Sequence, residues 1–326
     1  NYIQQKSYTQ IRQEFQEKFF KEIQPMVSSF EHERISNLYL AIFLTILFSV
    51  LFIAIFLYSG TIIKIEFIRN CFGIVGLFFG YLAVMTIPYI KKTFENSIKD
   101  NIMPIMCSCF GNLIWTKKYY YGNENLFYSS NLMRSALAHY DDIFTGSYND
   151  VKYEIIETHF VTGKQTIEVP FWKGVIIKLE MNKNFSGNTV LESHKKIQRG
   201  GFMSLISYNY DNFSNGCNKY TTLEDVNFNK QYDVYTDDEV EARYLLTTSF
   251  MEKLKNMKTA FKAVNVRCAF YNQYLLIGLE AKKDLFSICS LFKRIDDAKQ
   301  FFTMFEEIIS IIKLIDHLKL NQKIGL

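Results

Sequence analysis

The chain has 326 residues and a formal net charge of +4 at pH 7, and it contains no run rich in lysine or arginine. This mild balance argues against a nucleic-acid-binding protein, although a surface that faces anionic lipid needs no more positive charge. The six cysteines are dispersed, so no four-ligand zinc site is complete and reduced, mostly buried thiols are expected. They are Cys71, Cys107, Cys109, Cys217, Cys268 and Cys289.

Residues 10–30 have the pattern of an amphipathic helix. Apolar side chains recur at helical spacing, and charged or amide side chains occupy the other faces. The apolar stripe comprises Ile11, Phe15, Phe19, Ile23, Met26 and Phe30. We expect this helix to pair with a second amphipathic segment of the chain; a helix that lies flat on a membrane is the alternative.

Two stretches without any charged residue follow, residues 35–63 and residues 70–90. A helix that crosses the hydrocarbon core needs about 20 predominantly apolar residues, and lipid leaves its backbone polar groups no partner outside the helix. The sequence therefore predicts transmembrane helices at about 37–59 and 70–90. A pair of buried core helices is the alternative, and a signal peptide is disfavoured because the first stretch shows no small-residue cleavage site.

Basic residues are more numerous on the outer flanks of the two stretches than in the loop that joins them. The flanks carry Lys18, Lys21, Arg34, Lys91, Lys92 and Lys99, and the loop carries Lys64 and Arg69. Lysine and arginine are enriched on the cytoplasmic side of membrane helices. Both termini are therefore expected in the cytoplasm.

Gly73, Gly76 and Gly80 lie close to one face of the second predicted membrane helix. The spacing of Gly76 and Gly80 is the small-xxx-small pattern that lets two helices approach closely. We expect the first membrane helix of the same chain to be the partner of this face. Association with a second copy of the chain is the alternative.

The remainder of the chain indicates a further helix and then a different pattern. Residues 91–110 predict a juxtamembrane helix, because Phe94, Ile98, Ile102 and Ile105 form a stripe that matches residues 10–30. Residues 1–125 are interpreted as a membrane anchor, and residues 126–326 as a cytosolic α+β domain. The domain is expected to begin with a short helix at 129–140.

Strands and turns dominate the domain. Alternating or apolar runs bounded by turn residues predict strands at 151–160, 165–169, 171–182 and 202–208, with a strand pair or extended arm at 222–235 and a hairpin at 264–279. A capping-box pattern at Thr236 and Glu239 opens a helix expected to reach Met257, and a last helix is expected at 296–320. Since the connections are too short for crossovers, the fold class is α+β: a transmembrane helical hairpin with juxtamembrane helices, then an antiparallel sheet packed by C-terminal helices.

Motifs for catalysis and cofactor binding are absent from the sequence. Gly163-Lys164 lacks the first glycine of a P-loop, and neither a dinucleotide-binding fingerprint nor a nucleophile elbow occurs. The five histidines show no metal-binding spacing and are interpreted as surface or structural residues. We therefore expect no catalytic residue, no cofactor, no metal and no enzymatic activity.

The densest set of carboxylates lies at residues 233–241, and Arg243 follows it. As an interaction or acid–base site it would use Asp237, Asp238, Glu241 and Arg243. Acidic residues also stabilise the first turn of a helix, where they meet the positive end of its dipole. We favour this structural interpretation and keep the four residues as the place to look for a site.

The segment at 228–254 of the carboxy-terminal half reads FNKQYDVYTDDEVEARYLLTTSFMEKL. This segment carries most of a resemblance to a bacterial membrane family, domain-of-unknown-function family 3137. Further matching pieces lie at 153–158, 171–174, 185–189 and 315–320, and two membrane helices precede the domain in the family as well. The resemblance implies a prokaryotic inner-membrane protein with a cytosolic carboxy-terminal domain, and it carries over no catalytic or binding residue.

The function expected from these features is that of an integral protein of the bacterial inner membrane, with two spans and no catalytic role. Its partners would be the lipid bilayer and either a protein partner or a second copy of the chain, and no nucleic acid. One alternative is a membrane-anchored enzyme with an unrecognised acidic site. The other is an accessory subunit of a membrane complex.

Overall fold

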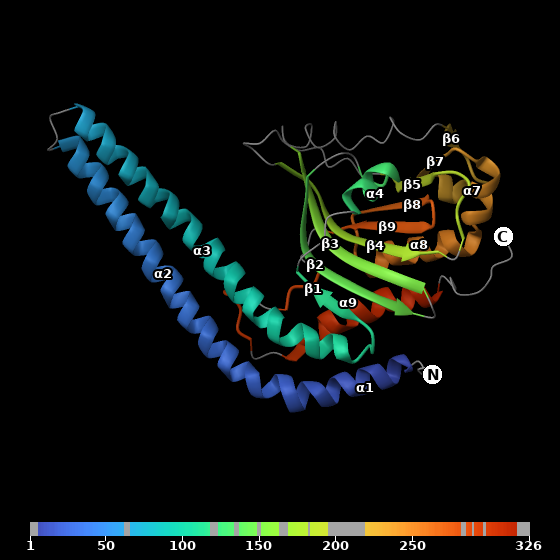
Figure 1. Cartoon of the computed structure of the whole chain (residues 1–326), viewed down its shortest axis with the longest axis horizontal. Helices are drawn as coiled ribbons and strands as arrows, with labels where there is room; N and C mark the ends of the chain where they lie inside the picture. Colours follow the sequence, from blue (N-terminus) through green and yellow to red (C-terminus); the bar gives the residue numbers. More distant parts are fainter. Residues whose placement is uncertain are drawn as a thin grey trace. The chain divides into compact units, whose positions relative to one another are not determined.

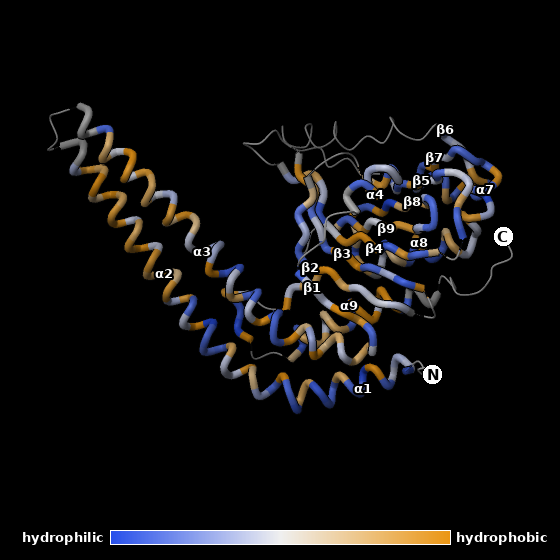
Figure 2. Tube along the Cα trace, viewed as in Figure 1, coloured by the Kyte–Doolittle hydropathy of each residue, from blue (hydrophilic) through white to orange (hydrophobic). Residues whose placement is uncertain are grey.

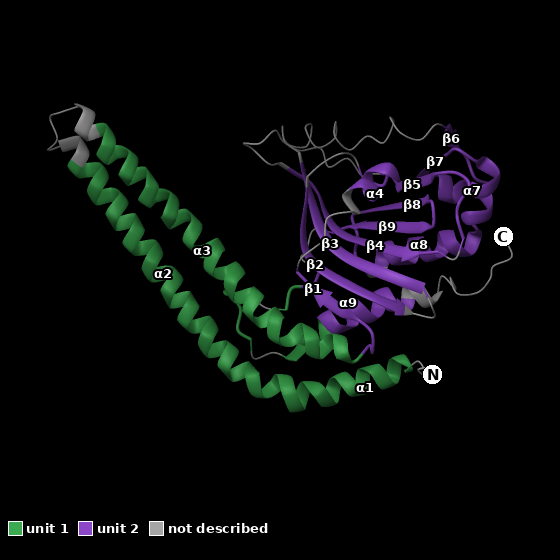
Figure 3. Ribbon diagram, viewed as in Figure 1, with its two compact units in different colours: residues 1–109, 287–303 green, residues 110–286, 304–326 purple. Residues whose placement is uncertain are grey.

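The computed structural model of the chain (Figure 1) describes residues 6–61, 66–117, 123–133, 137–148, 151–162, 169–181, 183–194, 219–281, 285–288, 290–295 and 298–317. They divide between two compact units (Figure 3): a helical unit of residues 1–109 and 287–303, and a sheet unit of residues 110–286 and 304–326. Helix α9 (Ala298–His317) begins in the helical unit and ends in the sheet unit.

Two long helical segments form the helical unit. Helix α1 (Tyr8–Lys18), the π-helical turn η1 (Phe19–Ile23) and α2 (Gln24–Thr61) follow one another without a break, and α3 (Glu66–Ser108) packs against α2. The π-helical turn comes directly before Pro25, which has no N–H and whose ring crowds the carbonyl four residues back, so the helix widens there. The helices predicted at 10–30 and 37–59 are thus one continuous helical segment, which bends between α1 and α2 (Figure 1), and those at 70–90 and 91–110 are the single helix α3.

A nine-stranded antiparallel sheet forms the second unit, in the order β1-β2-β3-β4-β9-β8-β5-β7-β6. The strands are β1 (Ile114–Thr116), β2 (Leu137–Tyr148), β3 (Val151–Thr162), β4 (Val169–Glu180), β5 (Thr189–Ser193), β6 (Lys219–Thr221), β7 (Tyr232–Thr236), β8 (Asn265–Tyr271) and β9 (Tyr274–Glu280). The helices of this unit are α4 (Asn123–Ser129), α6 (Val226–Asn229), α7 (Glu239–Leu245), α8 (Thr248–Ala260) and the end of α9. The predicted α+β class is confirmed, as are the strands at β3 and β4, the β8–β9 hairpin and the last helix.

Both faces of the central strands are buried. On one face, Phe127 of α4 and Met133 belong to a core cluster with Trp172, Ile176 and other strand residues. On the other face, Phe250 of α8 contacts Phe270 with ring centroids 5.4 Å apart. A strand that is covered on both faces has an apolar sequence without alternation. The β8 sequence therefore predicts a strand but does not indicate which of its side chains face the core.

The helix predicted at 129–140 is wrong. Helix α4 ends at Ser129, and Asn131 then takes a left-handed conformation with φ of 58°. From Leu137 the chain is already strand β2, which pairs with β3 over residues 137–148. The local helix propensity of this segment is outweighed by its pairing with β3, a long-range interaction that no short window contains.

The helix predicted from Thr236 to Met257 is two helices. Leu246 leaves the helical region with φ of −90° and ψ of 56°, and the Thr247 side chain accepts a hydrogen bond from the backbone N–H of Phe250. A threonine oxygen that caps a new helix competes with continuation of the old one. The arm predicted at 222–235 contains α6 and β7, whereas the strand predicted at 202–208 lies outside the described residues, as does most of the one at 165–169.

Candidate functional site

The helical unit carries two segments that are long and apolar enough to cross a membrane by length and composition, Tyr8–Tyr58 and Asn70–Ser108. Their most apolar windows have mean hydropathies of 3.0 and 1.9, and only 6% and 17% of each window is buried. Figure 2 shows the apolar colour along α2 and α3. The outward side chains include Tyr39, Phe43, Ile46, Val50, Ile53, Phe56, Ile74, Leu77, Val84 and Tyr89. A soluble protein rarely leaves so large an apolar surface in water.

Two of the three glycines singled out in the sequence lie at the α2–α3 contact. A Cβ atom at Gly80 would lie 3.2 Å from Cδ2 of Phe52, and one at Gly76 would lie 3.4 Å from Cγ2 of Ile55. A Cβ atom at Gly73 would have no heavy atom within 4 Å. Gly76 and Gly80 therefore permit the close approach of α2, and Gly73 does not take part in it.

A larger side chain at Gly80 is expected to destabilise the helix pair. At Gly80 even a single Cβ atom would be in tight contact with Phe52, and Gly80→Leu adds a whole side chain there. Overpacking of this kind costs about 1–3 kcal/mol. The matched control is Gly73→Leu, which enters open space and gains helix propensity. Thermal unfolding of the protein in detergent micelles measures both, and an equal loss in the two variants would contradict the contact.

The apolar stripe of α1 and η1 is covered by protein. Phe15 and Phe19 each contact the ring of Phe302, both with centroids 5.1 Å apart, and Phe19 also contacts Phe301. The Lys18 ammonium donates a hydrogen bond of 2.7 Å to the hydroxyl of Ser108, at the end of α3. The helix thus lies beside the ends of α3 and the start of α9, and its stripe is not available to a membrane surface.

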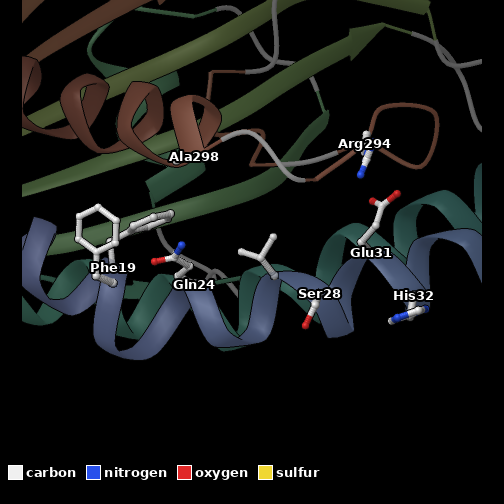
Figure 4. A pocket seen from close by; sticks show the side chains of 9 residues that line it. Phe19, Gln24, Ser28, Glu31, His32, Arg294 and Ala298 are labelled. Atoms are coloured by element: carbon white, nitrogen blue, oxygen red, sulfur yellow. The ribbon is translucent and has the colours of Figure 1, made fainter.

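A pocket of about 540 Å³ lies in the helical unit next to the charge-free stretch of α2 (Figure 4). Its walls are apolar at one end, where η1 supplies the rings of Phe19 and Phe20, and charged at the other. The lining residues are Phe19, Phe20, Gln24, Val27, Ser28, Glu31, His32, Arg294 and Ala298. We name it the juxtamembrane pocket. Its mixed lining suits an amphipathic ligand.

Two hydrogen bonds join residues 291–295 to α2 beside this pocket. Arg34 donates to the carbonyl oxygen of Leu291 at 2.9 Å, and it also donates two bonds of 2.8 and 2.7 Å to the carboxylate of Glu31. The same carboxylate accepts the backbone N–H of Ile295 at 3.0 Å. Leu291 and Ile295 are fully buried beneath these bonds. We call residues 291–295 the basic turn.

The attachment of the basic turn is expected to weaken in acid. Hydrogen bonds from Arg34, and then the N–H of Ile295, hold the pKa of Glu31 below its ordinary value despite partial burial. A carboxylate whose pKa is lower in the folded state stabilises it above the unfolded-state pKa, and this stabilisation is lost as pH falls through the folded pKa. The protection factor of the Ile295 amide, which compares its exchange rate with the intrinsic rate at the same pH, should therefore fall at acid pH. Glu31→Gln should abolish this dependence and Glu22→Gln, on the exposed face of η1, should preserve it.

The acidic cluster of the sheet unit is engaged in local hydrogen bonds. Asp238 caps α7 by accepting from the N–H groups of Val240 and Glu241 at 2.9 and 3.0 Å. The Glu241 carboxylate accepts the N–H groups of Ser186 and Gly187, each at 2.9 Å. The capping box predicted at Thr236 and Glu239 is not the cap that forms, because Asp238 takes the capping position.

Two members of the predicted site are placed differently. The Asp237 backbone N–H bonds the carbonyl oxygen of Asn188 at 3.1 Å, whereas Arg243 is exposed in the last turn of α7. Glu239, which is not one of the four, pairs with Lys219 at 2.5 Å. The network joins the loop before β5 to the start of α7.

Asp238→Ala is expected to lower the stability of the protein by about 0.5–2 kcal/mol, the usual cost of losing an N-cap. Asp238→Asn keeps the capping oxygen and should be close to wild type, because Asn and Asp cap equally well. Thermal unfolding gives the two stabilities, and a cellular phenotype gives the function. A catalytic carboxylate would show the opposite pattern, with Asp238→Asn stable but inactive.

The sequence did not single out a buried ion pair in the sheet unit. Arg267 of β8 is 2% exposed and donates from Nε and Nη2 to one carboxylate oxygen of Glu192, at 3.1 and 3.0 Å. The only hint in the sequence is one charge inside an otherwise apolar strand.

The pairing of β2 with β3 stacks the ring of His139 on that of His159, with centroids 4.9 Å apart, and Asp141 lies 3.8 Å from His159.

Three of the four cysteines within the described residues are buried, and Cys71 is exposed. Burial raises the pKa of Cys107 to about 12 and that of Cys109 to about 11, and it raises the pKa of Cys268 well above its ordinary value. All four cysteines within the described residues are free thiols. No group of three or more metal-ligating side chains is found in this part of the chain.

The fold is that of an α+β protein with a long apolar helical hairpin. Residues 171–320 match the model of the family "Protein of unknown function (DUF3137)", which confirms over this segment the resemblance seen in the sequence. No curated protein matches. A search of solved structures gives the mycobacterial trehalose monomycolate transport factor A, TtfA, with TM-score 0.30, 8% identity, and coverage of 64% of this chain and 91% of that chain. A likeness this weak carries no functional argument.

Proposed function

We propose that the protein is a membrane-tethered, non-catalytic interaction module of the bacterial inner membrane. In this proposal α2 and α3 cross the bilayer and the sheet unit lies in the cytoplasm. Its partner is a protein or the lipid of the inner leaflet next to the anchor. A catalytic role for the acidic cluster and an accessory role in a membrane complex are the competing functions.

The observation that carries the proposal is the exposed apolar surface of α2 and α3. In the first window 6% is buried, although its mean hydropathy is 3.0. A core helix of a soluble protein would be covered by other elements, whereas lipid covers a transmembrane helix without contributing to the protein's own burial. The alternative of a buried core helix pair is therefore disfavoured.

The orientation in the proposal is supported by the distribution of charge. Basic residues flank the outer ends of α2 and α3, and these ends lie together, since Lys18 bonds Ser108. Positive residues favour the cytoplasmic side. The non-catalytic assignment is supported by the carboxylates of Asp238 and Glu241, because both are engaged by backbone N–H groups.

Two measurements test the proposal. Extraction of native membranes at alkaline pH should leave the protein in the pellet, and protease should cleave tags on both termini only in inverted vesicles. For the non-catalytic assignment, a variant with Asp237→Asn, Asp238→Asn and Glu241→Gln should retain the cellular phenotype at permissive temperature. Extraction into the supernatant contradicts the anchor, and loss of phenotype with unchanged abundance contradicts the non-catalytic role.

A further inference from the structure

We propose that the basic turn, residues 291–295, is a third membrane contact that binds the interface of an anionic leaflet. The inference rests on the proposed function, because it needs α2 to cross the membrane. The partner of the basic turn is the lipid headgroup region. The turn lies more than 180 residues after α3 in the chain.

The depth of the turn is fixed by its hydrogen bonds to α2. Arg34 and Glu31 hold Leu291 and Ile295, and the charge-free stretch begins at the next residue, Ile35. A helix rises about 1.5 Å per residue, and the headgroup region on each side of the hydrocarbon core is about 5–8 Å thick. A segment held at Arg34 therefore lies at the level of the headgroups when α2 spans the bilayer.

The turn presents an aromatic ring and two basic side chains at this level. Phe292 is 59% exposed, and Lys293 and Arg294 are exposed beside it, whereas Leu291 and Ile295 on either side are fully buried. Burial of Leu291 and Ile295 fixes the backbone at both ends of the turn, and the three residues between them are exposed. An aromatic ring next to lysine and arginine is the composition of segments that settle at a membrane interface.

The direction of the turn agrees with this position. Figure 4 shows the chain at Arg294 extending past Glu31 in the direction in which α2 runs from Phe19 to His32, which is the direction of the charge-free stretch. Arg294 also lies at the charged end of the juxtamembrane pocket. The Arg294 side chain is exposed, and its positive charge helps to lower the pKa of Glu31.

Other residues at the same end of the hairpin suit the same interface. Tyr39 and Tyr89 are 69% and 72% exposed near the first turn of one apolar stretch and the last turn of the other, where tyrosine rings prefer to lie. Lys92 is exposed just beyond Tyr89. The basic turn therefore continues a band of tyrosine and lysine around the hairpin, and this continuity favours lipid over a protein partner.

Phe292→Trp provides the probe. The full-length variant is reconstituted in vesicles of phosphatidylcholine alone or with phosphatidylglycerol, each with lipid brominated at upper or at lower acyl positions. The fluorescence of the native Trp115 and Trp172 is measured in the wild-type protein and subtracted. We expect quenching of the added tryptophan by upper-position bromine, and stronger quenching with the anionic lipid. Each basic residue near an anionic surface corresponds to a roughly five-fold change in lipid binding, so Lys293→Gln with Arg294→Gln should remove the anionic preference.

Two reference positions make the result decisive. Phe20 is 54% exposed and lies on the same continuous helical segment. Phe20→Trp should be quenched much less, since about 20 Å of helix separates it from Ile35. Val50→Trp, 57% exposed near the middle of the charge-free stretch of α2, should be quenched by lower-position bromine. Quenching at Val50→Trp without quenching at Phe292→Trp overturns the inference and leaves the anchor intact. Absence of quenching at both positions overturns the proposed function itself.

Discussion

Replacing Arg267 by Met is expected to destabilise the protein by about 3–5 kcal/mol, the usual cost of breaking a buried ion pair from one side. The guanidinium is 2% exposed and supplies two hydrogen bonds to Glu192, whose side chain is 15% exposed. Among the described residues, the carboxylate then keeps the amide of Asn265, at 3.3 Å. A buried charge without its partner must either stay ionised at high cost or take up a proton.

The double variant Arg267→Met with Glu192→Leu separates loss of the pair from loss of packing. Replacing both partners of a buried pair by apolar residues is often neutral or stabilising, so this variant should recover most of the lost stability. Thermal unfolding of the full chain in detergent measures both, and about 2–4 °C is expected per kcal/mol for a unit of this size. If the double variant is no more stable than Arg267→Met, the loss comes from packing around Met133 and the ion pair is not its cause.

Local patterns in the sequence were sufficient for the elements that depend on local interactions. The apolar stretches predicted the long helices, and Asn272-Gln273 between two apolar runs predicted the β8–β9 hairpin. The stripe of residues 10–30 predicted a helix because its period is that of a helix. The resemblance to the family was also readable, since its motif lies in one continuous segment.

The features that could not be predicted depend on pairing over long distances in the chain. The bond from Arg34 to Leu291 joins residues 257 positions apart, and no spacing rule indicates it. The stacking of His139 on His159 follows from the register of β2 and β3, which the sequence did not give because 129–140 was interpreted as a helix. The same error concealed the Asp141 contact. For the acidic cluster the residue types predicted a helix cap, but the bonds from the N–H groups of Ser186 and Gly187 to Glu241 join segments 54 and 55 residues apart and could not be predicted.

Val50→Lys is expected to cost about 2.5–3.5 kcal/mol of membrane insertion, since a lysine at the centre of a transmembrane helix is opposed by that amount. Val50 is 57% exposed near the middle of the charge-free stretch of α2, so more than half of its surface is not covered by protein. In water the same exposed change would be nearly neutral for stability, within about 0.5 kcal/mol, and would favour solubility. The sign of the effect therefore depends on which solvent covers α2.

The measurement is the fraction of the protein that remains in native membranes after alkaline extraction. Val264→Lys makes the same substitution at a 45% exposed position of the sheet unit and should leave this fraction unchanged. Lysine near the ends of α2 can extend its ammonium to the headgroups, so Tyr39→Lys should cost much less than Val50→Lys. A graded loss with depth identifies lipid as the solvent of α2. If Val50→Lys instead is as abundant and more soluble than wild type, α2 faces water, and the membrane contact inferred at Phe292 fails with it.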